Sequence, residues 1–242
     1  MTRSLGWIAA IGLSIGVVSL SLAYVMGGRD LDHVMGRSIF AQSCDRPTKA
    51  DTSPSERRLA WAGDTVDIAL PATVRFRGGE GSDIVVRGAS DLIAHVEVRG
   101  NRIILDCRGG TRDVEITLPG TAFRRISLSG SATLAMENLS QRKLAVSISG
   151  SGSLNGQGTV DRLSVTVAGS GNAKLADVDT RQLAVKISGS GNVDAAPKDK
   201  ADINIAGSGN VRLFSRPPRL KSHIAGSGRV IQAPVQAAES TK

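Results

Sequence analysis

The sequence predicts an all-β fold, built as a single-stranded right-handed parallel β-helix (β-solenoid) with about 18–20 residues per coil. Three observations support this prediction: a glycine motif that recurs at a nearly constant step, apolar residues that recur with it, and a low aromatic content. Only 3% of the residues are aromatic, so the core must consist mainly of Val, Ile, Leu and Ala. Small branched side chains of this kind suit thin cores between strands.

The recurring motif is a Gly-Ser-Gly corner, with LSGSA at 128–132 as a variant first copy. The first glycines of successive copies are 18 to 20 residues apart, which is typical of stacked repeat units. We expect glycine here because it tolerates positive φ angles and lets neighbouring coils approach closely. The expected corner glycines are Gly150, Gly152, Gly169, Gly171, Gly189, Gly191, Gly207, Gly209, Gly226 and Gly228.

Apolar residues alternate on both sides of each corner, as in 163–167 and 173–175. This period of two predicts strands whose inward side chains stack into continuous rows, and it favours a solenoid over hairpins in an antiparallel sheet or sandwich. Asn172, Asn192 and Asn210 follow the second glycine in three successive copies. Stacked amides at such positions can form a hydrogen-bonded ladder.

Neither glycine-rich motif of the chain predicts a cofactor. The GSGN corner lacks the third glycine and the following helix of a dinucleotide loop. GGEGSDIVV at 78–86 fits a calcium-binding nonapeptide once, with Asp83 as a weak candidate ligand. A single copy lacks ligands from neighbouring turns, so we expect a plain glycine turn between strands at 73–77 and 84–87.

The remaining sequence divides the chain into segments. The 22 residues from Leu5 to Met26 carry no charge, which favours an uncleaved membrane anchor, with a cleaved signal peptide ending near Ala23 as the alternative. The expected organisation is a signal anchor or signal peptide at 1–28, a polar linker with room for one short helix at 29–58, a solenoid domain at 59–231 with capping strands at 59–118 and repeats at 119–231, and a flexible tail at 232–242.

Cys44 and Cys107 are the only cysteines, and an exported pair is a disulfide candidate. Their span of 63 residues would give a bridge worth roughly 4 kcal/mol on the chain-entropy model. Because Cys44 lies in the predicted linker, the sequence leaves the pairing open.

Charge and composition limit the function classes. The net charge is +8, and residues 121–242 hold 16 basic and 8 acidic side chains. A basic face of this kind is able to attract anionic partners, but the spread of its Lys and Arg favours an ordinary solvated surface. Nucleic acid is not expected, because the aromatic stacking platforms that bind single strands are lacking. His33, His95 and His223 stand singly, and no carboxylate pair is marked as an acid and a base, so no catalytic residues are predicted.

The repeated I/V-x-G-S-G-N-V units, preceded by VRFRGGEGSDIVVRG, HVEVRGNRIILDC and DVEITLPG, carry a resemblance. Residues 62–231 resemble the bacterial family called putative auto-transporter adhesin, head GIN domain. The resemblance implies an exported β-helix with an adhesin-like role and no catalytic residues. We expect a periplasmic location tethered to the inner membrane by residues 5–26, or, after cleavage, a soluble periplasmic or cell-surface location.

The first hypothesis is therefore a non-enzymatic interaction module of the cell envelope. Its expected partner is an envelope protein, a polysaccharide or an anionic lipid, with self-association through the solenoid edges as a further expectation. A carbohydrate-active enzyme on the same scaffold and an envelope-stress or signalling accessory protein are the alternatives.

Overall fold

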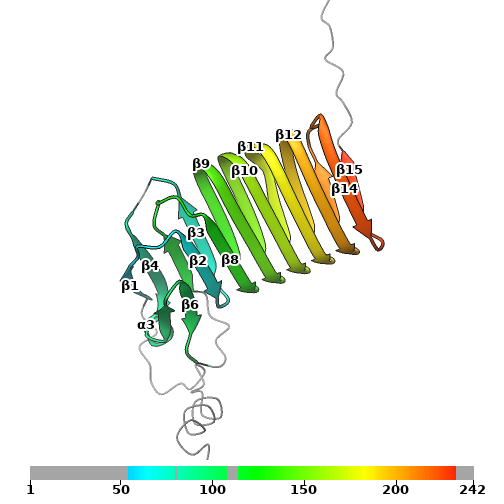
Figure 1. The fold of residues 1–242 in the computed structure, drawn as a ribbon. Helices are drawn as coiled ribbons and strands as arrows, with labels where there is room; N and C mark the ends of the chain where they lie inside the picture. Colours follow the sequence, from blue (N-terminus) through cyan, green and yellow to red (C-terminus); the bar gives the residue numbers. More distant parts are fainter. Residues whose placement is uncertain (1–53, 80, 108–113, 233–242) are drawn as a thin grey trace, which may run out of the picture. The chain divides into compact units, whose positions relative to one another are not determined.

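The computed structural model describes residues 54–79, 81–107 and 114–232. These residues confirm the predicted fold class, since nearly all of them belong to strands and the strands stack in parallel into a β-solenoid (Figure 1). The elements are β1 (Pro54–Ala60), β2 (Thr65–Ala69), β3 (Thr73–Arg77), β4 (Asp83–Ala89), α3 (Ser90–Ile93), β5 (Val96–Arg99), β6 (Arg102–Leu105), β7 (Glu115–Leu118), β8 (Arg125–Gly130), β9 (Thr133–Gly150), β10 (Ser153–Gly169), β11 (Asn172–Gly189), β12 (Asn192–Gly207), β13 (Asn210–Leu213), β14 (Arg219–Ala225) and β15 (Arg229–Gln232).

The long strands β9, β10, β11 and β12 each make one turn of the solenoid and end at a glycine corner (Figure 1). β9 pairs with β10, β10 with β11, and β11 with β12, all in parallel. Register shifts between neighbouring coils fall near the middle of each long strand, for example between Asn155 and Gln157. These irregularities mark the second bend of the coil, opposite the glycine corner.

Each turn contributes one strand segment to each of two faces. Face A consists of β5, β6, β2 and β8, the later halves of β9 to β12, and β14. Face B consists of β1, β4, β7 and β3, the earlier halves of β9 to β12, β13 and β15. The glycine corners join face A of one coil to face B of the next.

The core lies between the two faces and consists of the predicted apolar rows. Leu163 of β10 pairs with Leu183 of β11, and Val167 pairs with Ile187, so equivalent residues stack directly. All four are buried. Aromatic residues enter the core only near its N-terminal end, where the rings of Phe76 and Phe123 meet edge to face with centroids 5.8 Å apart. The narrow remainder of the core is aliphatic, as the composition predicts.

The N-terminal strands cap the stack by changing direction. β1 and β4 run antiparallel to their neighbours on face B, and β5 runs antiparallel to β6 on face A. β1 begins at Pro54, inside the segment predicted as a linker up to residue 58. The prediction missed this strand because β1 lies at a sheet edge, where proline is tolerated and an apolar alternation is not needed.

Several predictions fall on residues outside the described ranges. The apolar segment at 5–26, most of the linker and the tail from 233 onward lie outside them. Within the described ranges, no helix has the length and apolar character required to cross a bilayer.

The two glycines of each corner have different physical roles. The first glycine has a positive φ, +123° at Gly169, and a Cβ there would lie 2.5 Å from the carbonyl oxygen of Gly150 in the preceding coil. The second glycine has no left-handed φ, but a Cβ at Gly171 would lie 2.6 Å from Cγ2 of Ile148. Close approach is therefore required at both positions, and an unusual backbone conformation only at the first.

Three alanine substitutions separate these two requirements. Gly171→Ala adds only the steric conflict and should lower the free energy of unfolding by about 1–3 kcal/mol. Gly169→Ala combines the conflict with a positive φ and should cost about 3 kcal/mol or more. Urea unfolding followed by circular dichroism measures both effects.

Gly100→Ala is the matched control for backbone conformation. Gly100 has a φ of +64° with open space around its Cβ position, so the substitution should cost only about 1 kcal/mol. The proposed role of the corners would be wrong if Gly169→Ala were no more destabilising than this control.

Candidate functional site

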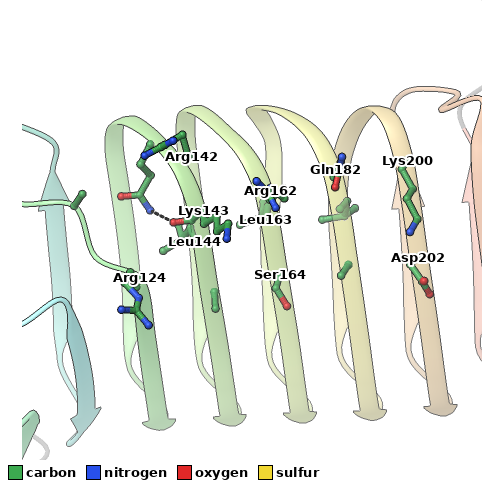
Figure 2. A pocket seen from close by; sticks show the side chains of 15 residues that line it. Arg124, Arg142, Lys143, Leu144, Arg162, Leu163, Ser164, Gln182, Lys200 and Asp202 are labelled. Carbon is green, nitrogen blue, oxygen red and sulfur yellow. Dashed lines mark hydrogen bonds between the residues drawn. The ribbon is translucent and has the colours of Figure 1, made fainter.

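An open groove on face A is the main candidate site. It has a volume of about 860 Å³ and crosses the coils from the segment before β8 to β12. Figure 2 shows Lys143, Arg162, Gln182 and Lys200 following one another across successive coils, with Arg124 and Arg142 at one end. The lining contains five cationic side chains and the single carboxylate of Asp202.

The parallel register creates this row of side chains. Lys143 pairs with Arg162, Arg162 with Gln182, Gln182 with Lys200, and Lys200 with Arg219 of β14. Neighbouring strands are about 4.8 Å apart, so each pair stands within reach of one anionic group. We call these five residues the basic row.

The sequence contains a signal for this row that lies outside the glycine motifs and the apolar pattern. Each member stands seven residues before the first glycine of its corner, as Lys143 does before Gly150 and Lys200 before Gly207. Four of the five residues at this outward position are cations, so the position recurs with the same step as the corner glycines. The spread of these residues along the sequence hid their proximity in the fold.

Four of the five cations in the groove have no carboxylate partner among the described residues, in contrast to the paired cations at the second bend of the coil. At the second bend, Arg181 pairs with Asp199 at 3.1 Å and Lys198 with Asp179 at 2.5 Å. Arg142, Lys143, Arg162 and Lys200 form no ion pair with any residue in the described part of the chain. Arg124 is the exception in the groove, since it lies 3.3 Å from Asp64.

The lining also limits which chemistry the groove can perform. No aromatic residue lines it, so a neutral sugar ring would find no stacking surface. The floor instead comes from buried leucines such as Leu163 and Leu183, flanked by the small residues Ser164 and Ala184. An apolar floor bordered by unpaired cations is suited to an extended anion.

The asparagine ladder predicted from the sequence is present on face B. Nδ2 of Asn192 donates to Oδ1 of Asn172 at 2.9 Å, and Nδ2 of Asn210 donates to Oδ1 of Asn192 at 3.1 Å. Ser153 and Arg229 occupy the equivalent positions in the flanking coils, so the ladder spans three coils. It strengthens the contact between coils beside the glycine corners.

The other candidate residues are not brought together. Asp83 begins β4 beside a glycine turn, and no group of three metal-ligating side chains occurs within the described ranges. His95 precedes β5 at one end of the stack and His223 lies on β14 at the other, while His33 falls outside the described residues. Cys107 packs against the core edge, and its candidate partner Cys44 also falls outside.

The carboxylates of the N-terminal strands are engaged by arginines. Asp67 lies 3.0 Å from Arg102, and Asp106 lies 3.5 Å from Arg99. The hydrogen bonds that Arg99 donates to the Glu97 carboxylate raise the pKa of Arg99, with a further contribution from Asp106. These carboxylates therefore take part in ion pairs at the N-terminal end of the solenoid.

Comparison with known proteins identifies a family and a fold. A family model described as "putative auto-transporter adhesin, head GIN domain" matches residues 64–217. A solved structure of a putative adhesin from Bacteroides fragilis superposes with a TM-score of 0.59 at 15% identity, covering 75% of this chain and 97% of that one. A putative lipid binding protein from Parabacteroides distasonis gives a TM-score of 0.48 at 16% identity, covering 76% and 98%. No curated protein matches the chain in sequence.

Removal of the central amide tests the ladder. Asn192→Ala breaks both hydrogen bonds and should lower the free energy of unfolding by about 1–2 kcal/mol. Asn155→Ala is the control, because Asn155 is exposed on the same face of the adjoining coil and its side chain makes no hydrogen bond to any residue that the structure describes. The control should change stability by less than about 0.5 kcal/mol, and equal effects of the two substitutions would contradict a stabilising ladder.

The Cys44–Cys107 disulfide stays a prediction, and peptide mapping without reduction tests it. We expect one cross-linked peptide pair and, after reduction, a loss of roughly 4 kcal/mol in the free energy of unfolding. A double Cys→Ala variant should be as unstable as the reduced protein. Alkylation of both thiols in the unreduced protein would rule the bridge out.

Proposed function

Because this chain belongs to the putative auto-transporter adhesin, head GIN domain family, we propose that it is a non-enzymatic interaction module of the bacterial cell envelope. Its ligand is a linear anionic polymer, such as a polysaccharide with carboxylate, sulfate or phosphate groups. The polymer lies along the groove of face A. The observation that carries this proposal is the row of cations without carboxylate partners that the parallel register builds there.

The shape of the site favours a chain over a flat surface. The cations follow one another across several coils beside an apolar floor, so an extended polymer meets Lys143, Arg162 and Lys200 in turn. A bilayer is flat and would contact only the rim of a groove. Multiple weak charge contacts along one polymer give avidity without deep burial of any single group.

The composition of the groove also supports a binding role over catalysis. Most glycoside hydrolases use two carboxyl groups on either side of the scissile bond. Asp202 is the one carboxylate that lines the groove, and Nδ2 of Asn204 lies 3.4 Å from its Oδ1. A second carboxylate that faces Asp202 across the groove is missing from the lining.

The sequence and the family both support the proposed location. Residues 5–26 are an uncharged segment of membrane-spanning length, and the family is described as a "putative auto-transporter adhesin, head GIN domain". We therefore place the solenoid outside the cytoplasm, tethered to the inner membrane by this segment. In that position the groove faces the polymers of the envelope.

Dextran sulfate and neutral dextran test the proposed ligand class, because they share one backbone and differ in charge. We expect the protein to bind dextran sulfate only, with an affinity that falls as salt screens the contacts. Arg162→Glu with Lys200→Glu reverses two charges of the basic row and should weaken binding at least tenfold. Isothermal titration calorimetry measures each affinity.

Lys174→Glu with Arg212→Glu is the matched control. It makes the same change in net charge at outward positions of face B, on either side of Asp194. Binding should fall less than threefold in this variant. If both double variants lost the same affinity for dextran sulfate, binding would depend on net charge alone, and the assignment of the ligand to the groove would be wrong.

A further inference from the structure

The C-terminal end of the solenoid has an open strand edge. β14 pairs with β12 on one side, and β15 pairs with β13 on one side, and neither has a second partner among the described residues. Every residue of β14 is exposed. The outer edges of β14 and β15 therefore present backbone N–H and C=O groups in the spacing that a further strand would match.

The apolar rows of the core are also uncovered at this end. Leu220 and Ile224 continue the inward rows of the preceding coils but are 36% and 38% exposed. Their counterparts Leu183 and Ile187, in the middle of the stack, are 2% and 0% exposed. One more strand with apolar side chains at alternate positions would cover both residues.

The last described coil carries charge of a single sign, although Asp202 of the preceding coil lies beside Lys221 in the register. Residues 203–232 contain no Asp or Glu. They contain five cations, none with a carboxylate partner in the described part of the chain: Arg212, Arg216, Arg219, Lys221 and Arg229. An occupant of this edge must therefore bring acidic groups.

The N-terminal end provides the contrast. Its edge strand β1 carries Glu56, which lies 2.9 Å from both Arg58 and Arg87. Hydrogen bonds from Arg58 and Arg87 lower the pKa of Glu56. Nη1 of Arg57 donates to the carbonyl oxygen of Val96 at 3.0 Å, which fixes β1 across the end of the stack. Both ends therefore have edge strands with one partner among the described residues, but the N-terminal edge carries a carboxylate paired with arginines, whereas β14 and β15 carry no carboxylate.

We propose that the C-terminal end binds an extended acidic peptide segment of a partner protein, which adds to β14 as the next strand. Backbone hydrogen bonds to the open edge supply the affinity. Alternating apolar side chains of the segment cover Leu220 and Ile224, and its acidic side chains pair with Arg219 and Lys221. This site adjoins the groove of face A, because Arg219 also ends the basic row, but it does not depend on the proposed ligand there.

Two other occupants fit the same observations less well. A second copy meeting this end through its own C-terminal end would bring ten cations together without a carboxylate between them. An anionic bilayer would pair with the cations but would leave the backbone groups of β14 without partners. Only a peptide strand satisfies the backbone, the apolar row and the charge together.

Fluorescence anisotropy with the full-length protein in mild detergent tests the proposal. The probe is the peptide Glu-Leu-Glu-Ser-Glu-Ile-Ala, which keeps the alternation of β14 and replaces its basic residues with glutamate. We expect saturable binding that is at least tenfold weaker for the Lys-Leu-Lys-Ser-Lys-Ile-Ala peptide. Lys221→Glu should weaken binding of the acidic peptide at least tenfold, whereas Arg162→Glu in the groove should leave it unchanged.

N-methylation separates strand addition from simple charge attraction. Methyl groups on alternate amides of the acidic peptide block one hydrogen-bonding edge and leave its charge intact, so two peptides, one with each edge blocked, are compared. At least one of them should lose binding tenfold or more. Equal binding of the parent and both methylated peptides would overturn strand addition.

Other outcomes would assign the edge to a different occupant and overturn the proposal. If the acidic peptide binds only after removal of residues 233–242, the occupant is the chain's own tail. If light scattering shows a dimer that Ile224→Lys dissociates, the occupant is a second copy of the chain. Attachment to phosphatidylglycerol vesicles that Lys221→Glu abolishes, without binding of the acidic peptide, would identify a membrane. Failure of the acidic peptide to bind in every form would leave no support for the site.

Discussion

The close approach of backbones at the glycine corners sets the register of the whole solenoid. At Gly189, a Cβ would lie 2.4 Å from the carbonyl oxygen of Gly169, and the amide of Ser190 donates to that same oxygen at 2.9 Å. No side chain fits between the coils at this point, so each coil must place its corner directly on the previous one. Once the corners are aligned, the alternation of each strand determines which residues stack inward. A one-residue slip would move every apolar side chain of a coil to the outside.

The same register also aligns the outward side chains of successive coils. Outward residues at equivalent positions form rows just as inward ones do, so a side chain that recurs at a constant distance from the corner becomes a linear array. The asparagine ladder uses this effect to bind coils together, and the basic row uses it to concentrate charge. The two rows have opposite consequences for stability. Stacked amides hydrogen-bond one another, whereas stacked cations repel, and a chain retains the second arrangement at some cost in stability. A ligand of opposite charge removes that cost.

The sequence was sufficient for the repeat, its strands, its corners and its ladder, because each depends on residues that recur at one step. Features that occur once were harder to predict. β1 and α3 have no periodic pattern: β1 is an edge strand that begins with Pro54, and α3 is a single turn that buries Leu92 and Ile93. The groove was missed for another reason. Its cations recur regularly, but charged residues are usually read one at a time as solvated surface, and only the observed register places them in line.

The two ends of the stack show what limits the addition of further strands to a solenoid. A parallel stack has no internal reason to stop, because each coil offers the next one an edge and an apolar row. At the N-terminal end, growth stops when β1, β4 and β5 reverse direction and paired charges cover the edge. At the C-terminal end, the apolar positions of the last described coil weaken, with Ser222 beneath the place where Ile203 continues the row. Like charges there oppose the addition of an identical end, yet they leave the backbone edge accessible. Like charges at this end disfavour association with a second copy and so favour solubility. The backbone groups of the edge stay available to accept one complementary strand.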